Sequence, residues 1–454
     1  MRTIFITSFN PFISRNILES DVLEAIKKTA DCRIVIFCPD YKKDYFVKNF
    51  ASENVLIEGI KDLPVRKQGI IFRYLSGSLL NTKTRFLHQK RKLSQDKDFF
   101  AYILSRFLAY FASKIPGVKS LARFLDHISI NSVFFKPFFE KYEPDLVFCT
   151  DIFHNSDINL LAEAKKSGIT VVGMVRSWDN ITNKGLFRFT PDKLIVHNET
   201  IKSEVVKYQG MKSGNIFVGG MPQLDYYFNE PRISRLDFFK NIGFDPSCRL
   251  VFLGPLGKRF IETDWQILEI LKNKSNEGSL PDDVRFLVRL PPNDKVELDY
   301  FLPSKRFFIY ETGVSFKEGS FSDKEVTNKE TIKLADSLFH SDLVVVYASS
   351  LIIDAVCFDK PVVCVSFDGF EKKDDLSSVG RFVKYYDHVK KMLKTNCCRV
   401  AENQDELVKN INLYLNNPQI DKDGRERFLR EQAYKFDGSS GLRIGKFIVS
   451  MLPK

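Results

Sequence analysis

Side chains suited to acid–base chemistry follow two apolar runs in the first half of the sequence. Asp151 and His154 come after the run DLVFCT at 145–150, and Asp179 comes after TVVGMV at 170–175. A carboxylate or an imidazole placed in a cleft can take the proton of an attacking hydroxyl, which a transfer reaction requires. We therefore expect one of these three to be a general base. The alternative is that each only caps a helix or lies on the surface.

Four further polar or aromatic side chains belong to the same part of the expected site: Arg15, Asn16, Trp178 and Asn180. Arg15 and Asn16 begin the first predicted helix, where they contact a phosphate or the acceptor, or lie on a solvated helix face. An indole such as Trp178 stacks on a sugar ring or packs in the core. Both pairs of interpretations stay open.

Phosphate chemistry is indicated in the second half of the chain. Ser349 and Ser350 end the apolar run DLVVVYASS at 342–350 and precede a helix-like pattern. A helix N-terminus offers unpaired N–H groups and a partial positive charge, so it can hold a diphosphate without a dedicated cation. Arg289 ends the strand-like run FLVRL and suits bidentate phosphate binding. The alternatives are a serine that only caps the helix and an exposed arginine.

Two more loops follow strand-like runs in this half. Gly254, Gly257 and Lys258 come after RLVFL, where glycines let the backbone approach a phosphate, although the spacing of a P-loop is not met. Thr312 follows RFFIYE at 306–311. An ordinary strand-to-helix turn is the alternative for both loops.

The elements that must position these side chains are parallel strands. Apolar, Val-rich runs alternate with helix-like patterns such as NLLAEAKKSG at 159–168, and the order strand, helix, strand predicts a right-handed parallel unit. One series of such units precedes the turn-rich stretch at 229–235 and another follows it. The sequence therefore predicts an α/β protein with two Rossmann-like, doubly wound parallel-sheet domains. In such sheets ligands bind beyond the carboxyl ends of the strands.

Several of these loops resemble a known superfamily. The run HSDLVVVYASSLIIDAVCFDKPVVCV resembles the donor-site helix of GT-B glycosyltransferases and of CDP-glycerol glycerophosphotransferases, with Asp354 one turn into the helix. The ending DGSSGLRIGKFI at 437–448 is similar to the tail of the same glycerophosphotransferases. RSWDNITNKG at 176–185 resembles a group of bacterial GT-B-like proteins. The likeness covers most of the chain except about 60–130.

This resemblance implies a GT-B fold whose two domains face a cleft. The expected parts are an acceptor domain at 1–228 with an insert at about 61–130, a donor domain at 229–436, and a helix at 437–454 that packs back toward the acceptor domain. A nucleotide-activated donor would be held by Ser349, Ser350, Asp354, Arg289, Gly254, Lys258 and Thr312. Asp354 would accept hydrogen bonds from the ribose hydroxyls. The scheme needs no cofactor and no metal, because helix dipoles and arginine neutralise the leaving diphosphate.

The formal charge of +11 is concentrated in one segment. Residues 66–123 contain thirteen Lys or Arg against two Asp, an excess of eleven, interleaved with aromatic residues. A basic helix with an aromatic face is suited to an anionic membrane interface. The alternatives are aromatics that bury against the first domain and a patch that binds an acidic polymer. Nucleic acid is not expected, because no nucleic-acid-binding motif accompanies the charge.

Cysteine usage and the chain start bear on the compartment. The eight cysteines lie mostly inside apolar runs without C-x-x-C pairs, so we expect neither a disulfide framework nor a structural metal. No run reaches the length of a membrane span or has a cleavage site. We expect a cytoplasmic enzyme, with the insert giving a peripheral position on the inner face of the membrane.

The leading hypothesis is a glycosyltransferase that moves a sugar from a nucleotide-sugar donor to a surface-polysaccharide or lipid-linked acceptor. The alternatives are a CDP-glycerol-type polyol-phosphate transferase, a non-hydrolysing sugar-nucleotide 2-epimerase, and a non-catalytic protein that binds a sugar nucleotide or a lipid. An epimerase needs no acceptor and no membrane contact, so the basic insert discriminates it from the transferases.

Overall fold

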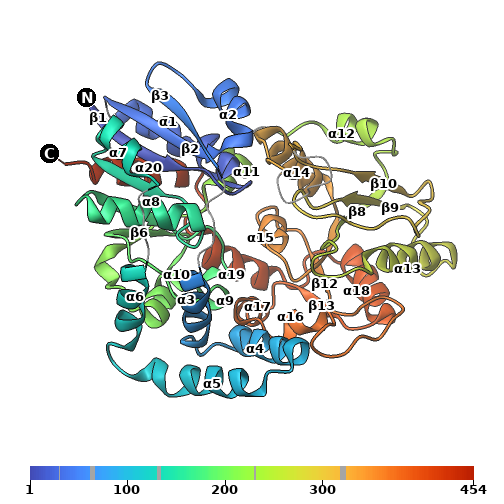
Figure 1. Cartoon of the computed structure of the whole chain (residues 1–454). Helices are drawn as coiled ribbons and strands as arrows, with labels where there is room; N and C mark the ends of the chain where they lie inside the picture. Colours follow the sequence, from blue (N-terminus) through green and yellow to red (C-terminus); the bar gives the residue numbers. More distant parts are fainter. Residues whose placement is uncertain (30, 62–66, 130–133, 230–231, 317–323, 454) are drawn as a thin grey trace. The chain divides into compact units, whose positions relative to one another are not determined.

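The computed structural model describes residues 1–29, 31–61, 67–129, 134–229, 232–316 and 324–453. The chain forms two compact units (Figure 1). Unit 1 comprises Met1–Pro222 and Ser439–Lys454, and unit 2 comprises Gln223–Gly438. Each unit is built on one sheet.

The sheet of unit 1 has, within the described residues, seven parallel strands in the order β3-β2-β1-β4-β5-β6-β7. The strands are β1 (Arg2–Thr7), β2 (Cys32–Pro39), β3 (Val55–Ile60), β4 (Leu146–Cys149), β5 (Thr170–Met174), β6 (Lys193–Val196) and β7 (Ile216–Val218). The order reverses between β1 and β4, and a parallel sheet of this kind binds its ligands beyond the carboxyl ends of the strands at that reversal.

The sheet of unit 2 has the same plan with six strands in the part that the structure describes, in the order β10-β9-β8-β11-β12-β13. The strands are β8 (Arg249–Gly254), β9 (Val284–Arg289), β10 (Phe307–Tyr310), β11 (Leu343–Tyr347), β12 (Val362–Val365) and β13 (Arg399–Ala401). Strands β11 and β12 are buried along their whole length, because helices cover both faces. The predicted fold class, two doubly wound parallel-sheet domains, is confirmed.

Helices connect the strands in both units. Unit 1 contains η1 (Ser14–Leu18), α1 (Asp21–Thr29), η2 (Asp40–Lys42), α2 (Lys43–Phe50), α3 (Lys67–Ser78), α4 (Lys83–Asp96), α5 (Phe99–Tyr110), η3 (Ala112–Lys114), α6 (Val118–Ser129), α7 (Lys136–Tyr142), α8 (Asn155–Lys166), α9 (Asn180–Asn183), α10 (Glu199–Glu204), η4 (Val205–Gln209), η5 (Ser213–Asn215) and α20 (Ser440–Ser450). After η6 (Pro222–Leu224), unit 2 contains α11 (Asp225–Asn229), α12 (Arg235–Ile242), α13 (Asp264–Asn276), α14 (Asn328–His340), α15 (Leu351–Val356), α16 (Gly380–Tyr385), α17 (Asp387–Leu393), α18 (Gln404–Asn416) and α19 (Lys422–Ala433).

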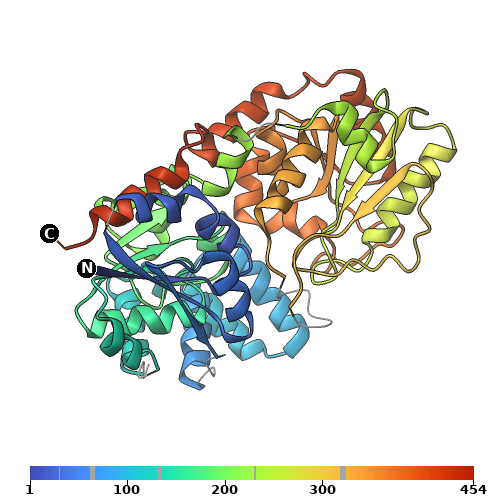
Figure 2. The same cartoon turned by 90° about the horizontal axis from the view of Figure 1, so that it is seen from above.

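Helix α20 packs along α1, and both cartoon views place the two helices side by side (Figure 2). Two glycines allow this close approach. A Cβ atom at Gly445 would lie 2.5 Å from Cβ of Ala25, and one at Gly441 would lie 2.9 Å from Cβ of Asp21. Between them Ile444 is fully buried in the core of unit 1. The last segment of the chain therefore completes the core of the first unit.

The insert between β3 and β4 consists of α3, α4, α5, η3 and α6 in the described residues. Helix α4 is bonded to α9, the turn that follows β5. Thr82 Oγ1 donates to the carbonyl of Thr182 (2.8 Å), and Arg85 Nη1 donates to the carbonyl of Asn183 (3.1 Å). At the other end Arg188 makes two 2.7 Å hydrogen bonds to buried Asp126 of α6. The insert is thus attached to the segment that connects β5 to β6.

Among the described residues, every helix is too short or too polar to cross a membrane. All eight cysteines lie in the described part of the chain as free thiols, and all but Cys357 are buried. Within the described residues, no three histidine, cysteine, aspartate or glutamate side chains form a cluster that could hold a metal ion.

Candidate functional site

A hydrogen-bonded network fixes the backbone where β1 and β4 end in unit 1. Thr7 Oγ1 donates to Asp157 Oδ1 (2.5 Å) and accepts from the backbone N–H of Thr150 (2.9 Å). The same Asp157 oxygen accepts from the backbone N–H of Asp151 (3.1 Å). All four residues are buried. The loop after β4 is therefore held rigidly at the reversal of strand order.

His154 lies at the start of α8, where it contacts this network. Its Nδ1 lies 3.5 Å from Asp157 Oδ2, and its ring stacks on Phe9 with centroids 5.5 Å apart. The side chain is 35% exposed, so a substrate hydroxyl can reach it. Burial lowers the pKa of His154, but the hydrogen bond and charge of Asp157, with the charge of Asp151, outweigh it and raise the pKa above its ordinary value. The same Nδ1 accepts from the backbone N–H of Ser156 (3.3 Å), so the ring caps α8. A partly exposed imidazole whose pKa is raised is suited to proton transfer.

This pairing predicts the pH dependence of turnover. A neutral imidazole accepts a proton only above its pKa, so kcat/KM should rise with pH and reach half its plateau above pH 6.5, the ordinary value for histidine. Asp157→Asn removes the charge that raises the pKa, and the midpoint should move to lower pH. Measuring kcat/KM against pH for both proteins checks this. A midpoint that stays in place in the variant would assign the titration to another group.

Asp151 is engaged by cations instead of lying open to a substrate. Its Oδ2 accepts from Arg176 Nε (2.8 Å) and lies 3.6 Å from Lys184 Nζ, while its Oδ1 accepts from the backbone N–H of Phe153 (3.1 Å). Burial opposes ionisation, but Lys184 and Arg176 overcome it and hold the pKa of Asp151 below its usual range. A carboxylate so stabilised is a weak base. The contacts of Asp151 therefore favour a role in positioning Arg176 and Lys184.

Asp179 and its neighbours form a tight turn after β5. Asp179 accepts from Ser177 Oγ (2.6 Å) and from Asn183 Nδ2 (3.1 Å). Trp178 is only 7% exposed, which favours packing over stacking on a sugar. The side-chain amide nitrogen of buried Asn180 has no hydrogen-bond partner among the described residues, so it can donate to a ligand. Asp179 braces this turn through both carboxylate oxygens.

Arg15 and Asn16 lie in η1, the turn after β1. Arg15 Nε donates to Asn16 Oδ1 (2.9 Å), and its guanidinium lies over the ring of Phe12, 5.4 Å from the centroid. Asn16 is buried. Since β1 ends beside β4, Arg15 belongs to the same sheet edge as the His154 network.

Arg176, Lys184 and His197 were not predicted as site residues, and the structure adds them to this edge. His197 follows β6, is 1% exposed, and neither ring nitrogen has a hydrogen-bond partner in the described part of the chain. Burial, with the charge of Arg176, lowers the pKa of His197 to about 4. Arg176 lies two residues after β5 and His197 lies directly after β6, so the rule that selected Asp151 could have found them. Lys184 lies nine residues beyond the last residue of TVVGMV and carries no such signal.

In unit 2 the reversal of strand order lies between β8 and β11, where Gly254 meets α15. A Cβ atom at Gly254 would lie 2.5 Å from Leu351 Cδ2 and 2.9 Å from Val346 Cγ1. Ser349 is partly exposed and Ser350 exposed. Ser350 occupies the N-cap position of α15, yet its side chain makes no capping hydrogen bond. Asp354 Oδ1, one turn along, accepts from Tyr227 Oη (2.9 Å).

The contact at Gly254 predicts a loss of stability on substitution. Gly254→Ala should lower the free energy of unfolding by about 1–3 kcal/mol, because the added methyl group forces Leu351 or the strand to move. Gly214→Ala is the control, since a Cβ atom there meets nothing within 4 Å. Denaturant unfolding of the two variants checks this, and equal midpoints would show that α15 accommodates the methyl group freely.

The loop between β8 and α13 is closed by an acidic residue. Buried Asp264 accepts from the backbone N–H groups of Leu256 (3.0 Å) and Gly257 (2.7 Å). Burial raises the pKa of Asp264 to about 6, against the lowering effect of those two hydrogen bonds. Lys258 instead pairs with Glu297 on the surface (2.5 Å). A phosphate that binds these two N–H groups, as predicted for this loop, would therefore have to displace the carboxylate of Asp264.

Arg289 ends β9, and Thr312 lies two residues beyond the end of β10. Arg289 is 8% exposed, and its Nε has no hydrogen-bond partner among the described residues. It is in register with Tyr310, whose hydroxyl lies 3.2 Å from Ser337 Oγ. Thr312 is buried and donates to the carbonyl of Leu290 (3.0 Å).

The predicted donor residues thus differ in how close they lie to the point where the strand order reverses. Gly254, Ser349, Ser350 and Asp354 lie at the reversal, and Arg289 lies one strand from β8, about 5 Å away by the usual strand spacing. Thr312 is one strand further, with its hydroxyl used internally. Lys258 is paired on the surface. These residues remain a predicted donor site.

No protein-family model matches the chain, and no curated protein sequence matches it. Solved structures match it over nearly its whole length. They include UDP-GlcNAc 2-epimerase from Neisseria meningitidis bound to UDP-GlcNAc (TM-score 0.54, 11% identity, 100% of this chain and 99% of that one). They also include the wall teichoic acid polymerase TagF (0.52, 12%, 99% and 89%) and a glycosyltransferase from Rickettsia africae (0.50, 10%, 99% and 98%). At such identities the likeness shows the fold alone, which is the GT-B fold.

Proposed function

We propose that this chain is a glycosyltransferase that moves a sugar from a nucleotide-sugar donor to a glycan or lipid-linked acceptor at an anionic membrane surface. The observation that carries the proposal is the exposed apolar face of α5, which belongs to an insert bonded to the turn that bears Asp179 and Lys184.

Helix α5 exposes large apolar side chains along one side. Phe100 is 78% exposed, Ile103 49%, Phe107 55% and Phe111 57%. Helix α6 also exposes apolar residues, namely Leu121, Phe124 and Leu125. Contiguous apolar surface on this scale marks a binding face. The alternative in which these aromatics bury against the first domain is wrong for α5, whose buried residues are Ser105 and Ala109.

Charge complementarity favours an anionic bilayer as the partner of this face. Lys97 precedes α5 and Lys114 follows it, and both are exposed. Cations at the ends of an apolar helix face can reach lipid phosphates while the rings enter the interface. Three other cations of the insert are used internally, since Arg85, Lys119 and Arg123 donate to backbone carbonyls. The charge excess is therefore only partly available to a partner.

The proposed chemistry follows from the two sheet edges. Unit 2 would hold the nucleotide diphosphate near Arg289 and the serines, with Asp354 on the ribose. The acceptor hydroxyl would attack the anomeric carbon as the carbon–oxygen bond to the diphosphate breaks. His154 would take the hydroxyl proton, and the diphosphate would leave with the bonding electron pair. Arg176 and Lys184, held by Asp151, would supply positive charge beside the acceptor.

Three other functions remain alternatives. The N. meningitidis 2-epimerase resembles the chain in fold, yet an epimerase acts on a soluble sugar nucleotide and has no use for the α5 face. A CDP-glycerol-type polyol-phosphate transferase would use that face equally well. A non-catalytic protein that binds a sugar nucleotide or a lipid would not need the His154–Asp157 pair.

Thermal shift against UDP-, GDP-, CDP- and CMP-linked donors identifies the nucleotide, because a ligand that binds only the folded state raises its stability. The stabilising donor is then incubated with membrane lipid extract, and transfer to the lipid phase is measured. Conversion of a UDP-sugar to its 2-epimer without an acceptor would establish the epimerase instead. Stabilisation by CDP-glycerol alone would establish the polyol-phosphate transferase, and no stabilisation by any donor would overturn all three enzymes.

A further inference from the structure

Helices α3, α4 and α5 enclose a cavity of about 400 Å³ that none of the predicted site residues lines. Resting on the proposed function, we infer that this cavity binds the phosphorylated sugar headgroup of the acceptor. Its volume lies within the range of small-molecule sites, about 300–1,000 Å³.

The wall of the cavity carries a positive charge excess. Lys92 and Lys184 line it together with His88, against Asp96 and Asp98. Arg85 also lines it, but its guanidinium donates to the carbonyls of Gly77 and Asn183. Lys92 Nζ lies 4.0 Å from Asp96 Oδ2, with both side chains more than half exposed, so a phosphate can compete for the lysine. Asp98 accepts from the backbone N–H of Ala101 (2.9 Å) and is thus used as the cap of α5. The cations are suited to a phosphate and the remaining carboxylate to sugar hydroxyls.

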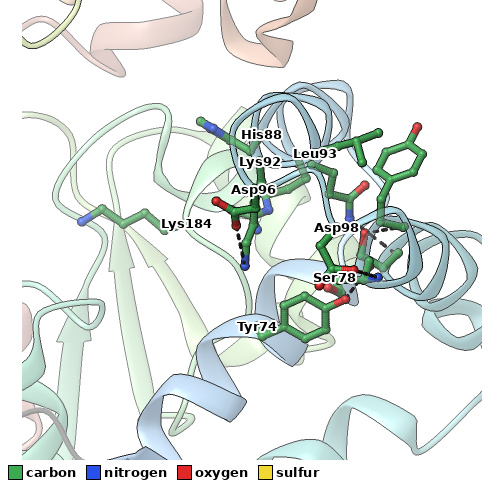
Figure 3. A pocket seen from close by; sticks show the side chains of 13 residues that line it. Tyr74, Ser78, His88, Lys92, Leu93, Asp96, Asp98 and Lys184 are labelled. Atoms are coloured by element: carbon green, nitrogen blue, oxygen red, sulfur yellow. Dashed lines mark hydrogen bonds and ion pairs between the residues drawn. The ribbon is translucent and has the colours of Figure 1, made fainter.

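The same wall offers polar and aromatic groups for a carbohydrate. Tyr74 of α3 donates to the carbonyl of Ala101 (2.6 Å), and its ring lies 5.4 Å from Lys92 Nζ. Figure 3 shows Tyr74 and Ser78 on α3, with His88, Lys92 and Asp96 on α4 and Lys184 on a separate segment. Aromatic rings beside hydroxyl and carboxylate groups are the combination that a sugar contacts through its apolar face and its edge.

Two connections lead from this cavity to the candidate catalytic residues. Lys184 lines the cavity and lies 3.6 Å from Asp151, which also holds Arg176. His88 Nε2 lies 2.7 Å from Asn183 Oδ1, and Asn183 Nδ2 donates to Asp179 (3.1 Å). A headgroup in the cavity would therefore touch the residues that order the loops after β4 and β5.

The cavity also adjoins the apolar face. Ala101, Tyr102 and Ser105 of α5 line the cavity, while Ile103 and Phe107 of the same helix are exposed. One helix thus separates a cavity that is lined by cations from a surface suited to lipid. An acceptor whose phosphosugar enters the cavity would keep its hydrocarbon chain beside the exposed face of α5.

The test measures binding of two probes to the full-length protein. Glucose 1-phosphate is titrated calorimetrically, and neutral phosphatidylcholine vesicles that carry a polyprenyl-phosphate-linked sugar are used for flotation. Lys92→Met, which removes a cavity cation, and Ala101→Phe, which fills the space, should each weaken glucose 1-phosphate binding at least about tenfold. Lys83→Met is the matched control, because Lys83 is an exposed lysine of α4 that does not line the cavity. It should bind as the unmodified protein does.

Binding of both probes would support a lipid-linked acceptor, and binding of glucose 1-phosphate alone would support a free phosphosugar in the same cavity. The inference is overturned if the unmodified protein binds neither probe, or if both cavity variants bind like the control at unchanged melting temperature. Stabilisation by the nucleotide donor is measured on the same proteins. Donor stabilisation without phosphosugar binding would overturn this inference and leave the proposed function standing, whereas loss of both would overturn the proposed function.

Discussion

Replacing His154 with glutamine should lower kcat about 10²- to 10⁴-fold while leaving the Kd of the nucleotide donor unchanged. The imidazole is partly exposed, and Asp157 raises its pKa above the ordinary value for histidine. General-base catalysis contributes a factor of this size. Glutamine keeps the length and polarity of the side chain but has no basic nitrogen. Steady-state kinetics with calorimetric donor binding measures both quantities.

His127→Gln is the matched control, because His127 is an exposed histidine on α6, against the ring of Phe189. It should turn over normally. Asp151→Asn and Asp179→Asn belong in the same series, since both were predicted as alternative bases. If the His154 variant is fully active and either aspartate variant loses about 10² in kcat at unchanged melting temperature, the base is that aspartate.

The second large effect concerns the α5 face. Changing Phe100, Ile103 and Phe107 together to serine should reduce partitioning to anionic vesicles by at least about 10²-fold, because each ring or branched chain loses about 1–2 kcal/mol of interfacial burial. The melting temperature should hold, since the three side chains are about half or more exposed. Sedimentation with anionic and with neutral vesicles at two salt concentrations measures the partitioning.

The matched control changes Leu236, Tyr300 and Leu302 to serine, three exposed apolar residues of unit 2. It should pellet with vesicles as the unmodified protein does. Lys97→Gln with Lys114→Gln should weaken binding at low salt and matter less at high salt, because attraction to lipid is screened over about 10 Å at 0.1 M. Vesicle binding that is equally strong in the triple α5 variant, or absent from the unmodified protein at low salt, would rule the face out.

The sheets could be predicted from the sequence because their strands are nearly uniform in character. Runs such as DLVVVYASS are buried on both faces, and a buried parallel strand needs apolar residues at every position. The end of each run then locates the sheet edge where ligands bind. Asp151, His154 and Ser349 were selected by this rule, and the structure places them at those edges.

The ranking of the candidate bases could not be predicted, because it depends on contacts from distant parts of the chain. Asp151 is neutralised by Arg176 and Lys184, which come from the next βα unit, and His154 is polarised by a carboxylate that Thr7 of β1 holds. The sequence around Asp151 or His154 alone does not reveal these contacts. The pattern of the insert likewise gave its charge and aromatic content but not which side of α5 is covered.

The return of α20 to unit 1 has a consequence for how the protein is made. Gly441 and Gly445 let α20 lie directly on α1, and Ile444 and Ile448 fill the core there. On the ribosome, α20 emerges only after all of unit 2. Until then Val22 and Ile26 of α1 lack the cover of α20, while the second unit can already fold. The nascent first unit therefore exposes an apolar surface to which chaperones can bind. The first unit would be completed, and chaperones would be released, only when α20 has been synthesised and packs on α1.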